Sequence, residues 1–284
     1  MENPDYLLIG TVCQDMVDTG FLIGGTVAYS GLTARNLGCQ TAAITSFAED
    51  FAFLPILSGI EVLRQPSPVT TTYQNIYVDG RRQQYVRAVA SPIARSLVPP
   101  EWTQARIVHI GPLVQEVDPN IVDLFPNSLI GITPQGWMRH WDETGRVRPT
   151  RWHPPADLLR RTKVLVLSEE DVGGDLSIID EYARQIEILV LTSGWKGSSV
   201  YWQGQVTFLP APEVREVDPT GAGDVFAAAY LVRLHETGDP IAAARFANCV
   251  ASCSVERRGI DGIPTPQEMA QCRGGWRTPG ACDS

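Results

Sequence analysis

The sequence predicts an α/β fold with a mostly parallel central sheet that helices cover on both faces. Short apolar runs typical of buried strands alternate with helical patterns along most of the chain. Such alternation is the pattern of parallel strands joined by crossover helices. A chain of 284 residues is long enough for one large α/β domain with an insertion. We therefore expect one domain over residues 1–273, followed by a frayed tail over 274–284.

The individual elements follow from local patterns. Apolar runs predict strands at 6–13, 41–47, 107–110, 129–132, 164–167, 188–191, 198–202 and 206–209. Helical patterns fall at 27–37, 154–161, 176–185, 221–235 and 241–255. The first helix is expected to end at Gly38, because glycine adopts the left-handed conformation that closes many helices. Ligands of parallel sheets bind at the carboxyl ends of the strands, so we expect the functional residues there.

Residues 70–89 follow a different pattern. Polar and aromatic residues alternate with a period of two, and Asp79-Gly80 is a favoured hairpin turn. We expect an antiparallel hairpin with a polar face, inserted around residues 66–92. This hairpin is a candidate for a lid over the site, for an edge sheet or for the surface of a homodimer.

Composition excludes several partners. The net charge of −9 argues against nucleic acids and anionic membranes, because both attract basic surfaces. The short acidic start of the chain is unlike a signal peptide, and no apolar run approaches the roughly 20 residues that span a bilayer. We therefore expect a cytoplasmic protein without a membrane partner.

The six cysteines show no zinc spacing and no CxxC pair. Cys249 and Cys253 are one helical turn apart, so we expect them to share a helix face. We interpret them as small buried hydrophobic residues rather than as a metal or redox site.

The most informative segment is 218–224, Asp-Pro-Thr-Gly-Ala-Gly-Asp, which precedes an apolar helix of small residues. A Gly-Ala-Gly turn at the start of a helix presents backbone N–H groups and the positive end of the helix dipole to an anion. Asp224 falls in the first helical turn, where a carboxylate can accept the proton of an attacking hydroxyl. An anion site beside a base is what phosphoryl transfer to an alcohol requires.

The full string resembles the C-terminal signature of the ribokinase/PfkB carbohydrate kinase family. The resemblance implies a ribokinase-like three-layer α/β/α sandwich with a small β-hairpin lid. It implies that Asp224 is the catalytic base and that Gly221, Ala222 and Gly223 line the anion hole. It also implies a monovalent cation such as K⁺ near Asp218.

A second glycine cluster, Thr192-Ser-Gly194-Trp-Lys196-Gly197, directly follows an apolar run. It resembles the Thr-x-Gly-x-x-Gly nucleotide loop of the same family, so we expect Thr192, Gly194 and Gly197 to border ATP. Lys196 is a candidate phosphate contact, although a solvated loop lysine is an equally good interpretation. The resemblance places Asn248, on the last long helix, near the adenine.

Three acidic residues follow Ser168 at the end of a predicted strand, ending with Asp171. Clustered carboxylates invite a cation. The family has an Asn-x-x-Glu motif here that helps to organise Mg²⁺ and phosphate, and this chain has Ser168 and Asp171 in those two positions. Helix capping by Ser168 is the alternative interpretation.

The acceptor site is expected near the N-terminus. Gly24-Gly25 before a predicted helix resembles the first signature of the family, in which Asn commonly stands where this chain has Tyr29. Asp15 matches the acidic residue that binds acceptor hydroxyls. Gln135 follows another strand end and is expected to border the same cleft.

The sequence thus predicts an ATP- and Mg²⁺-dependent kinase acting on a hydroxyl of a small sugar or polyol, most similar to the myo-inositol-kinase-like branch. Alternatives are a catalytically weak sugar- or nucleotide-binding protein and a nucleoside or sugar-phosphate kinase. A phosphorylated acceptor needs converging basic residues, for which Arg35, Arg82 and Arg87 are candidates. A nicotinamide-dependent dehydrogenase is disfavoured because no GxGxxG follows the first strand.

Overall fold

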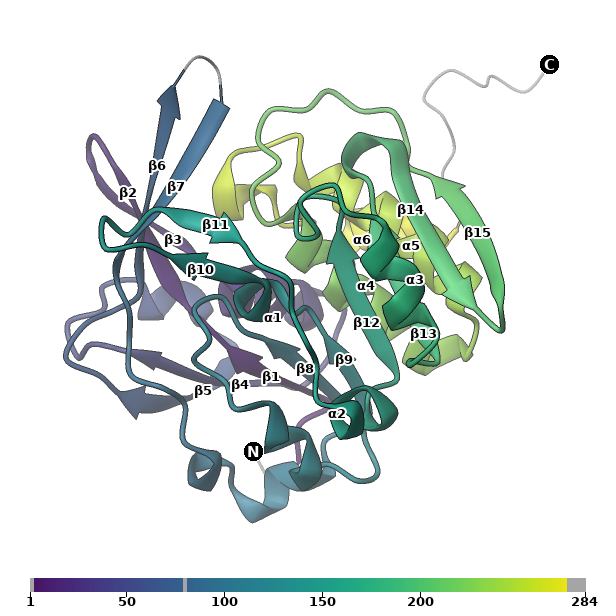
Figure 1. The fold of residues 1–284 in the computed structure, drawn as a ribbon, viewed down its shortest axis with the longest axis horizontal. Helices are drawn as coiled ribbons and strands as arrows, with labels where there is room; N and C mark the ends of the chain where they lie inside the picture. The colour runs from purple at the N-terminus through teal and green to yellow at the C-terminus, as the bar shows by residue number, and fades with distance from the viewer. Residues whose placement is uncertain (1–2, 79–80, 275–284) are drawn as a thin grey trace.

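The computed structural model describes residues 3–78 and 81–274. The strands of its main sheet are β1 (Tyr6–Gly10), β4 (Thr41–Phe47), β5 (Ile60–Pro66), β8 (Ile107–Gly111), β9 (Leu129–Ile132), β12 (Val164–Ser168), β13 (Ile188–Thr192), β14 (Gly197–Trp202) and β15 (Gln205–Pro210). Their order is β15-β14-β13-β12-β9-β8-β1-β4-β5 (Figure 1). Pairing is parallel from β5 to β13 and antiparallel between β13, β14 and β15.

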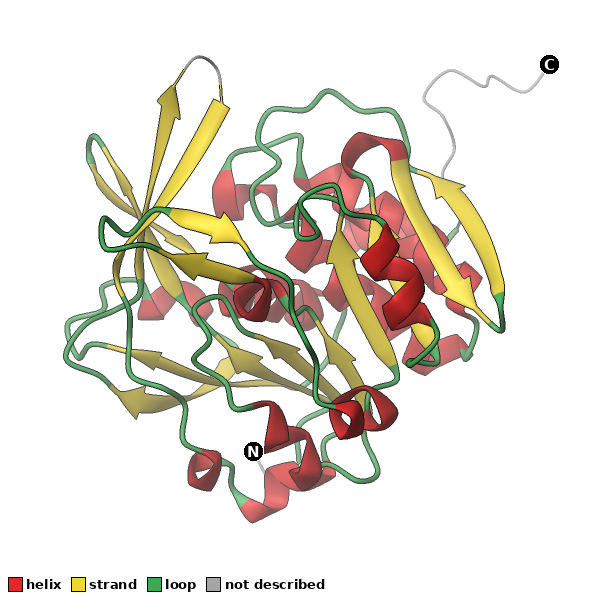
Figure 2. Ribbon diagram, viewed as in Figure 1, coloured by secondary structure: helices red, strands yellow, loops and turns green. Residues whose placement is uncertain are grey.

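Helices cover both faces of this sheet (Figure 2). One face carries α1 (Thr26–Asn36), α4 (Ala222–Thr237) and α5 (Pro240–Ser254), with α6 (Pro266–Arg273) packed on α5. The other face carries α2 (Ala156–Arg161) and α3 (Ser177–Ala183). Successive side chains of a strand point to opposite faces, so in β1 Leu8 joins the α1–α4 core while Leu7 and Ile9 join the other core. The predicted three-layer α/β/α fold is confirmed.

A second, smaller sheet stands beside the main one. Its strands are β2 (Cys13–Val17), β3 (Gly20–Gly24), β6 (Thr72–Val78) and β7 (Arg81–Ala88), in the order β3-β2-β6-β7. The predicted hairpin is the β6–β7 pair, and its predicted turn at Asp79-Gly80 lies outside the described residues.

The expectation of one strand over residues 6–13 is wrong. β1 ends at Gly10, and the chain then leaves the main sheet to form β2. A Cβ on Gly10 would lie 2.2 Å from the carbonyl oxygen of Gly111, so the ends of β1 and β8 approach too closely for any side chain there. The division into one domain over 1–273 stays a prediction, and residues 275–284 of the expected tail lie outside the described part.

Several short elements were not predicted. The strands β10 (Arg139–Trp141) and β11 (Val147–Pro149) form a polar hairpin of three-residue strands, and α6 buries only Met269 and Cys272. Such elements have too few apolar positions to show a period. In the described part of the chain no helix is both long and apolar enough to cross a membrane.

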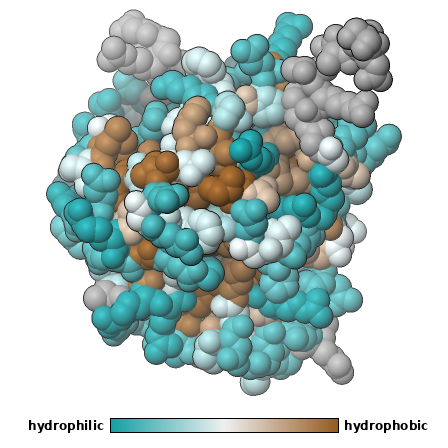
Figure 3. All heavy atoms as spheres, turned by 90° about the vertical axis from the view of Figure 1, so that its right-hand side faces the viewer, coloured by the Kyte–Doolittle hydropathy of each residue, from teal (hydrophilic) through white to brown (hydrophobic). Residues whose placement is uncertain are grey.

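The β15 edge leaves apolar side chains at the surface. Val206 and Phe208 are exposed on this strand, and Figure 3 shows apolar atoms gathered on this side of the molecule. A hollow of about 490 Å³ lies between α3 and the β14–β15 turn. None of the predicted site residues lines this hollow, so it is not the predicted site.

Candidate active site

The Gly-Ala-Gly turn opens α4 as predicted. Gly221 is the residue before the helix and has a φ of 78°, the left-handed conformation. A Cβ on Gly221 would lie 2.2 Å from the ring of Tyr29, so both the conformation and the space require glycine. The Ala222 amide donates to the Pro219 carbonyl at 3.1 Å. The first-turn amides of Gly223 and Asp224 point along the helix axis in the geometry of an anion site.

Asp224 lies in the first turn of α4 and contacts α1. Its side chain hydrogen-bonds to Thr26, and its carbonyl accepts from the Ser30 hydroxyl at 2.9 Å. Burial raises the pKa of Asp224 to about 6, and the negative charge of Asp171 adds to this, while Thr26 and Arg139 lower it. A carboxylate with such a pKa is ionised at neutral pH and still holds a proton well, as a general base must.

Acidic residues predicted from distant parts of the chain meet around Tyr29. Burial raises the pKa of the Tyr29 phenol well above its usual value, and the charges of Asp218, Asp15 and Asp224 raise it further. Tyr29 itself is almost fully buried in α1. The predicted acceptor-binding carboxylate and the predicted base therefore lie close enough for their charges to act on the same phenol.

Asp15 is positioned by the two glycines of the first signature. It lies in β2, and a Cβ on Gly24 would come within 2.6 Å of its Oδ2 atom. Gly25 has a φ of 92°, and a Cβ there would lie 2.5 Å from the carbonyl oxygen of Thr11. Glycine at both positions lets β3 turn into α1 directly beside the carboxylate.

Ser168, Asp171 and Gln135 form one hydrogen-bonded group. Asp171 Oδ2 accepts from the Ser168 hydroxyl at 2.7 Å and from its amide at 2.9 Å, and Oδ1 accepts from Gln135 Nε2 at 3.0 Å. Ser168 does not cap a helix, because a turn follows it and α3 begins only at Ser177; its hydroxyl accepts from the Asp171 amide within that turn. Gln135 contacts Asp171, and its place at the acceptor site stays a prediction.

Asp218 holds the loop that precedes the anion turn. Its Oδ1 accepts from the Thr220 amide at 3.0 Å and its Oδ2 from the Gly259 amide at 2.9 Å. Burial opposes ionisation, but these hydrogen bonds keep the pKa of Asp218 below its usual value. The carboxylate therefore ties the turn to the segment after α5.

The predicted nucleotide residues lie in the segment between β13 and β14 and on α5. Lys196 and the 78% exposed Trp195 are on the surface of the loop, whereas Gly197 is buried against the Leu209 carbonyl. Asn248 is only 4% exposed and donates to Leu209 O at 3.0 Å. Asn248 thus has a structural partner whether or not it also borders an adenine.

Basic residues on the β10–β11 hairpin were missed at the sequence level. Arg139, Arg146 and Arg148 line a hollow of about 180 Å³ together with Asp171. Arg139 also donates to Gln84 of β7 at 3.2 Å and lowers the pKa of Asp224, so it lies between the small sheet and the predicted base. Arg139 comes soon after the end of a predicted strand, which is a weak sequence signal for a site residue. Nothing in the sequence pattern marked Arg146 or Arg148.

Of the basic residues named for a phosphorylated acceptor, the two whose side chains are described bind different partners. Arg35 donates to Ser58 O at 2.7 Å, and Arg87 donates to Gln74 and Thr144. The side chain of Arg82 lies outside the described residues. His109 is a buried core residue, and burial lowers its pKa to about 3.

The fold is similar to that of solved ribokinase-like proteins. A solved pyrophosphate-dependent kinase in the ribokinase family, complexed with a pyrophosphate analog and myo-inositol, superposes with a TM-score of 0.76, at 22% identity over 93% of this chain and 99% of that one. The Arabidopsis thaliana ribokinase complexed with ribose and ATP superposes with a TM-score of 0.70, at 17% identity over 95% of this chain and 98% of that one.

Sequence comparison gives the same family. Residues 169–267 match the model of the pfkB family carbohydrate kinases. The probable fructokinase-5 of Arabidopsis thaliana is 29% identical over 162 residues, 53% of this chain and 46% of the relative. The ribokinase of Bacillus subtilis is 39% identical over 98 residues, 34% of this chain and 33% of the relative. The inositol 3-kinase of Arabidopsis thaliana is 23% identical over 271 residues, 90% of this chain and 75% of the relative.

The predicted resemblance to the ribokinase/PfkB carbohydrate kinase family is confirmed by the family match over residues 169–267. The matches span less than two thirds of the length of the first curated relatives, at 46%, 33% and 64%. The reaction, the donor and the acceptor are therefore matters of proposal.

Proposed function

We propose that this protein is an ATP-dependent kinase that phosphorylates a hydroxyl of a small sugar, polyol or cyclitol. The observation that carries the proposal is Asp224, a carboxylate with a pKa of about 6 in the first turn of α4, directly after the left-handed Gly221. One helix start thus supplies both the base and the anion hole.

In the proposed mechanism, Asp15 fixes acceptor hydroxyls and Asp224 accepts the proton of the attacking one. The Gly223 and Asp224 amides, together with the dipole of α4, stabilise the charge that develops on the transferred group. The small sheet that carries β7 contacts Arg139 through Gln84, and it excludes water from the cleft when it closes.

A magnesium ion fits the donor set at the end of β12. Glu170 and Asp171 supply carboxylate oxygens beside the arginine-lined hollow, and Mg²⁺ prefers such oxygens while keeping several waters. When bound, the ion would neutralise charge on the donor phosphates. Asp218 is the proposed residue near a monovalent cation, because its carboxylate lies directly behind the anion turn.

A second candidate donor is inorganic pyrophosphate. Arg139, Arg146 and Arg148 line one small hollow with Asp171, and guanidinium groups bind phosphate oxygens in a fork geometry. A donor made only of phosphates gains most from such a cluster. Three solved neighbours are described as pyrophosphate-dependent kinases, one of them a myo-inositol-1 kinase.

The decisive experiment measures phosphoryl transfer with Mg·ATP and with magnesium pyrophosphate against sugars, myo-inositol, other polyols, nucleosides and sugar phosphates. We expect turnover with one acceptor class, and its loss by several orders of magnitude in Asp224→Asn. The matched control is Asp239→Asn, which also replaces an Asp at a helix start but where Asn caps equally well. Near-normal turnover of Asp224→Asn contradicts the mechanism, and binding without turnover in the wild type favours a binding protein.

The small sheet is the proposed surface of a homodimer. The β2 and β3 strands of this sheet carry four exposed apolar residues: Met16, Val17, Phe21 and Leu22. Light scattering after gel filtration should give twice the chain mass, and Phe21→Ser should shift it toward the monomer. A cytoplasmic location is likewise part of the proposal, and cell fractionation tests it.

A further inference from the structure

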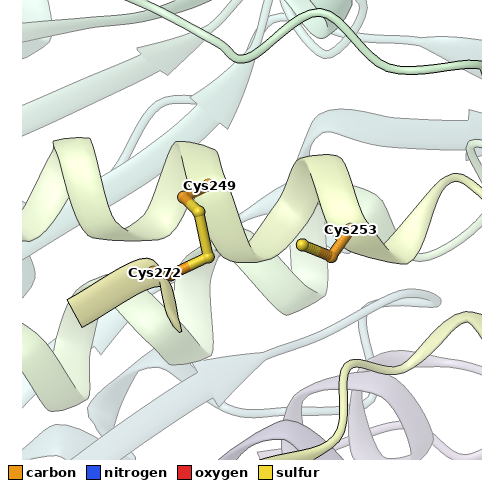
Figure 4. Close-up of side chains that lie close together, drawn as sticks. All are labelled: Cys249, Cys253 and Cys272. Atoms are coloured by element: carbon orange, nitrogen blue, oxygen red, sulfur yellow. A yellow bond between two sulfur atoms is a disulfide. The ribbon is translucent and has the colours of Figure 1, made fainter. Parts of the chain in front are cut away.

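Three cysteines meet where α6 packs on α5. Cys249 and Cys253 lie on α5 and Cys272 lies on α6, and their Sγ atoms are all within 4.8 Å of one another (Figure 4). Cys249 and Cys272 form a disulfide, and Cys253 is a free thiol beside it. The interpretation of Cys249 as only a small buried hydrophobic residue is therefore wrong, because its partner comes from a helix that the sequence did not reveal.

The disulfide is a main attachment of a weakly held helix. α6 has eight residues, of which only Met269 and Cys272 are buried. Polar contacts add to these: Glu268 pairs with Arg257, in the segment between α5 and α6, at 2.9 Å, and Arg273 pairs with Glu236 at 2.7 Å and lies over the Phe246 ring. Partly exposed ion pairs contribute little to stability, so a short helix with two buried side chains opens easily once its covalent link is cut.

Hydrogen bonds connect α6 to the anion turn. Arg257 binds Glu268 of α6 with two nitrogens and also donates to Gly262 O at 3.3 Å, which fixes the segment after α5. In that segment Val255 O accepts from the amide of Asp218 at 3.1 Å, and the Gly259 amide donates to the Asp218 carboxylate. Asp218 in turn binds Thr220, next to Gly221.

We propose that Cys249, Cys253 and Cys272 form a reversible oxidation site, in which Cys272 is the shared partner of two thiols on α5, and that its disulfide holds the donor side of the anion turn in place. Oxidation needs a small-molecule disulfide, RSSR. The Cys272 thiolate attacks RSSR and releases RS⁻, and the Cys249 thiolate then attacks the mixed disulfide at Cys272 and releases a second RS⁻. Both thiol protons end on the two RS⁻ groups, so the protein loses two electrons and RSSR gains them.

Cys253 serves as the alternative partner. Burial raises the pKa of its thiol to about 11, so it is protonated and does not attack the disulfide while α6 is docked. If Cys249 is absent, however, Cys253 has the nearest sulfur on α5 to Cys272. A buried thiol that only filled space would not replace a missing partner.

The first test maps the disulfides of the full chain. Protein equilibrated with glutathione disulfide is alkylated, digested without reductant and analysed by mass spectrometry. We expect a Cys249–Cys272 link in the wild type and in Cys253→Ser, a Cys253–Cys272 link in Cys249→Ser, and neither link in Cys272→Ser. Three free thiols in the wild type, a Cys272 link to Cys39 or Cys282, or zinc retained by the reduced protein would each overturn the proposal.

The second test asks whether the link acts on the donor site, and this arm rests on the proposed function. Calorimetry with Mg·ATP should show donor binding weakened roughly five-fold or more after reduction by a dithiol, since coupling between sites is typically of this size. Cys272→Ser should bind like the reduced protein and ignore the dithiol, whereas Cys39→Ser should keep the response. Equal affinity in both redox states refutes the coupling. Absence of donor binding in both states, with the disulfide map as expected, refutes the proposed donor and leaves the oxidation site standing.

Discussion

The ring of Tyr29 lies against the backbone of Gly221, close enough that a Cβ on Gly221 would come within 2.2 Å of it. The contact joins the first signature of the chain to the last, since Tyr29 is in α1 and Gly221 opens α4. In the family an Asn commonly occupies the position of Tyr29. The aromatic ring here closes the space behind the anion turn and so fixes the turn through packing.

We expect Gly221→Ala to abolish turnover and to lower stability more than a glycine replacement elsewhere. Gly238→Ala is the matched control: Gly238 also has a positive φ, 67°, but open space around its Cβ position. The control should cost about 1–2 kcal/mol of the free energy of unfolding, the cost of left-handed alanine. Chemical denaturation compares the two, and equal losses would show that the Tyr29 contact is unimportant.

The activity should depend on the ionisation of Asp224. Because the base must be unprotonated, kcat/KM should rise with pH through an apparent pKa of about 6. Two variants that each remove one charge should shift this acidic limb of the pH profile of kcat/KM in opposite directions. Asp171→Asn removes a charge that raises the Asp224 pKa and should shift the limb to lower pH, while Arg139→Gln should shift it to higher pH.

Rates alone would not test this electrostatic relationship, since both variants also alter the site. The measurement is therefore the pH profile of the residual kcat/KM, with Arg160→Gln, an exposed arginine on α2, as the control that leaves the limb in place. Shifts of the same sign in both variants would contradict the assigned geometry.

Asp224→Asn should be inactive yet more stable than the wild type at neutral pH. The pKa of Asp224 is about 6 in the folded protein and near 4 in the unfolded chain, so the protonated carboxyl stabilises the fold. This contribution is fully present below pH 4 and is lost as the pH rises through about 6. Asn cannot ionise, so the variant avoids this loss. Thermal unfolding at pH 8 should show a higher Tm for Asp224→Asn, and the gap should narrow at pH 4. A lower Tm at pH 8 would show that the pKa of Asp224 is not raised in the folded protein.

The sheet and its helices were predictable because each carries several apolar positions with a clear period. The β12 and β13 strands are continuous buried runs, and α4 follows a glycine turn. The proposed base and the proposed anion turn were equally visible, because one contiguous segment supplies both. Residues adjacent in sequence keep their spacing whatever the fold does around them.

Features built from distant, polar segments were not predictable. The arginines that line the hollow beside Asp171 belong to a hairpin of three-residue strands, and Cys272 belongs to a helix with two buried residues. Neither segment has a hydrophobic period, so their positions depend on tertiary contacts alone. The charge of a residue does not say where its side chain lies, so Arg35 was a candidate for the acceptor site although it binds Ser58 O in the structure.

The arginine cluster distinguishes the two candidate donors. If Arg146 and Arg148 bind donor phosphates, Arg146→Gln and Arg148→Gln should each raise the donor KM with little change in kcat for the acceptor-saturated enzyme, since such contacts are made before and during transfer. The effect should be larger for pyrophosphate than for ATP, because ATP also has a nucleoside to bind. An unchanged KM for both donors would remove the hollow from the donor site.

Asn248 offers a final separation of structural from binding roles. Its amide donates to Leu209 O in a site that is 4% exposed, so Asn248→Ala removes a buried hydrogen bond and should cost about 0.5–1.5 kcal/mol of the free energy of unfolding. Asn248→Asp keeps the size but cannot donate when ionised, and should be at least as damaging. If the adenine also depends on this amide, ATP affinity falls in Asn248→Ala while affinity for pyrophosphate is retained. Equal losses of affinity for both donors would mean that Asn248 acts only through the position of β15. Urea unfolding measures the stability of each variant, and calorimetry on the same protein measures its donor affinity.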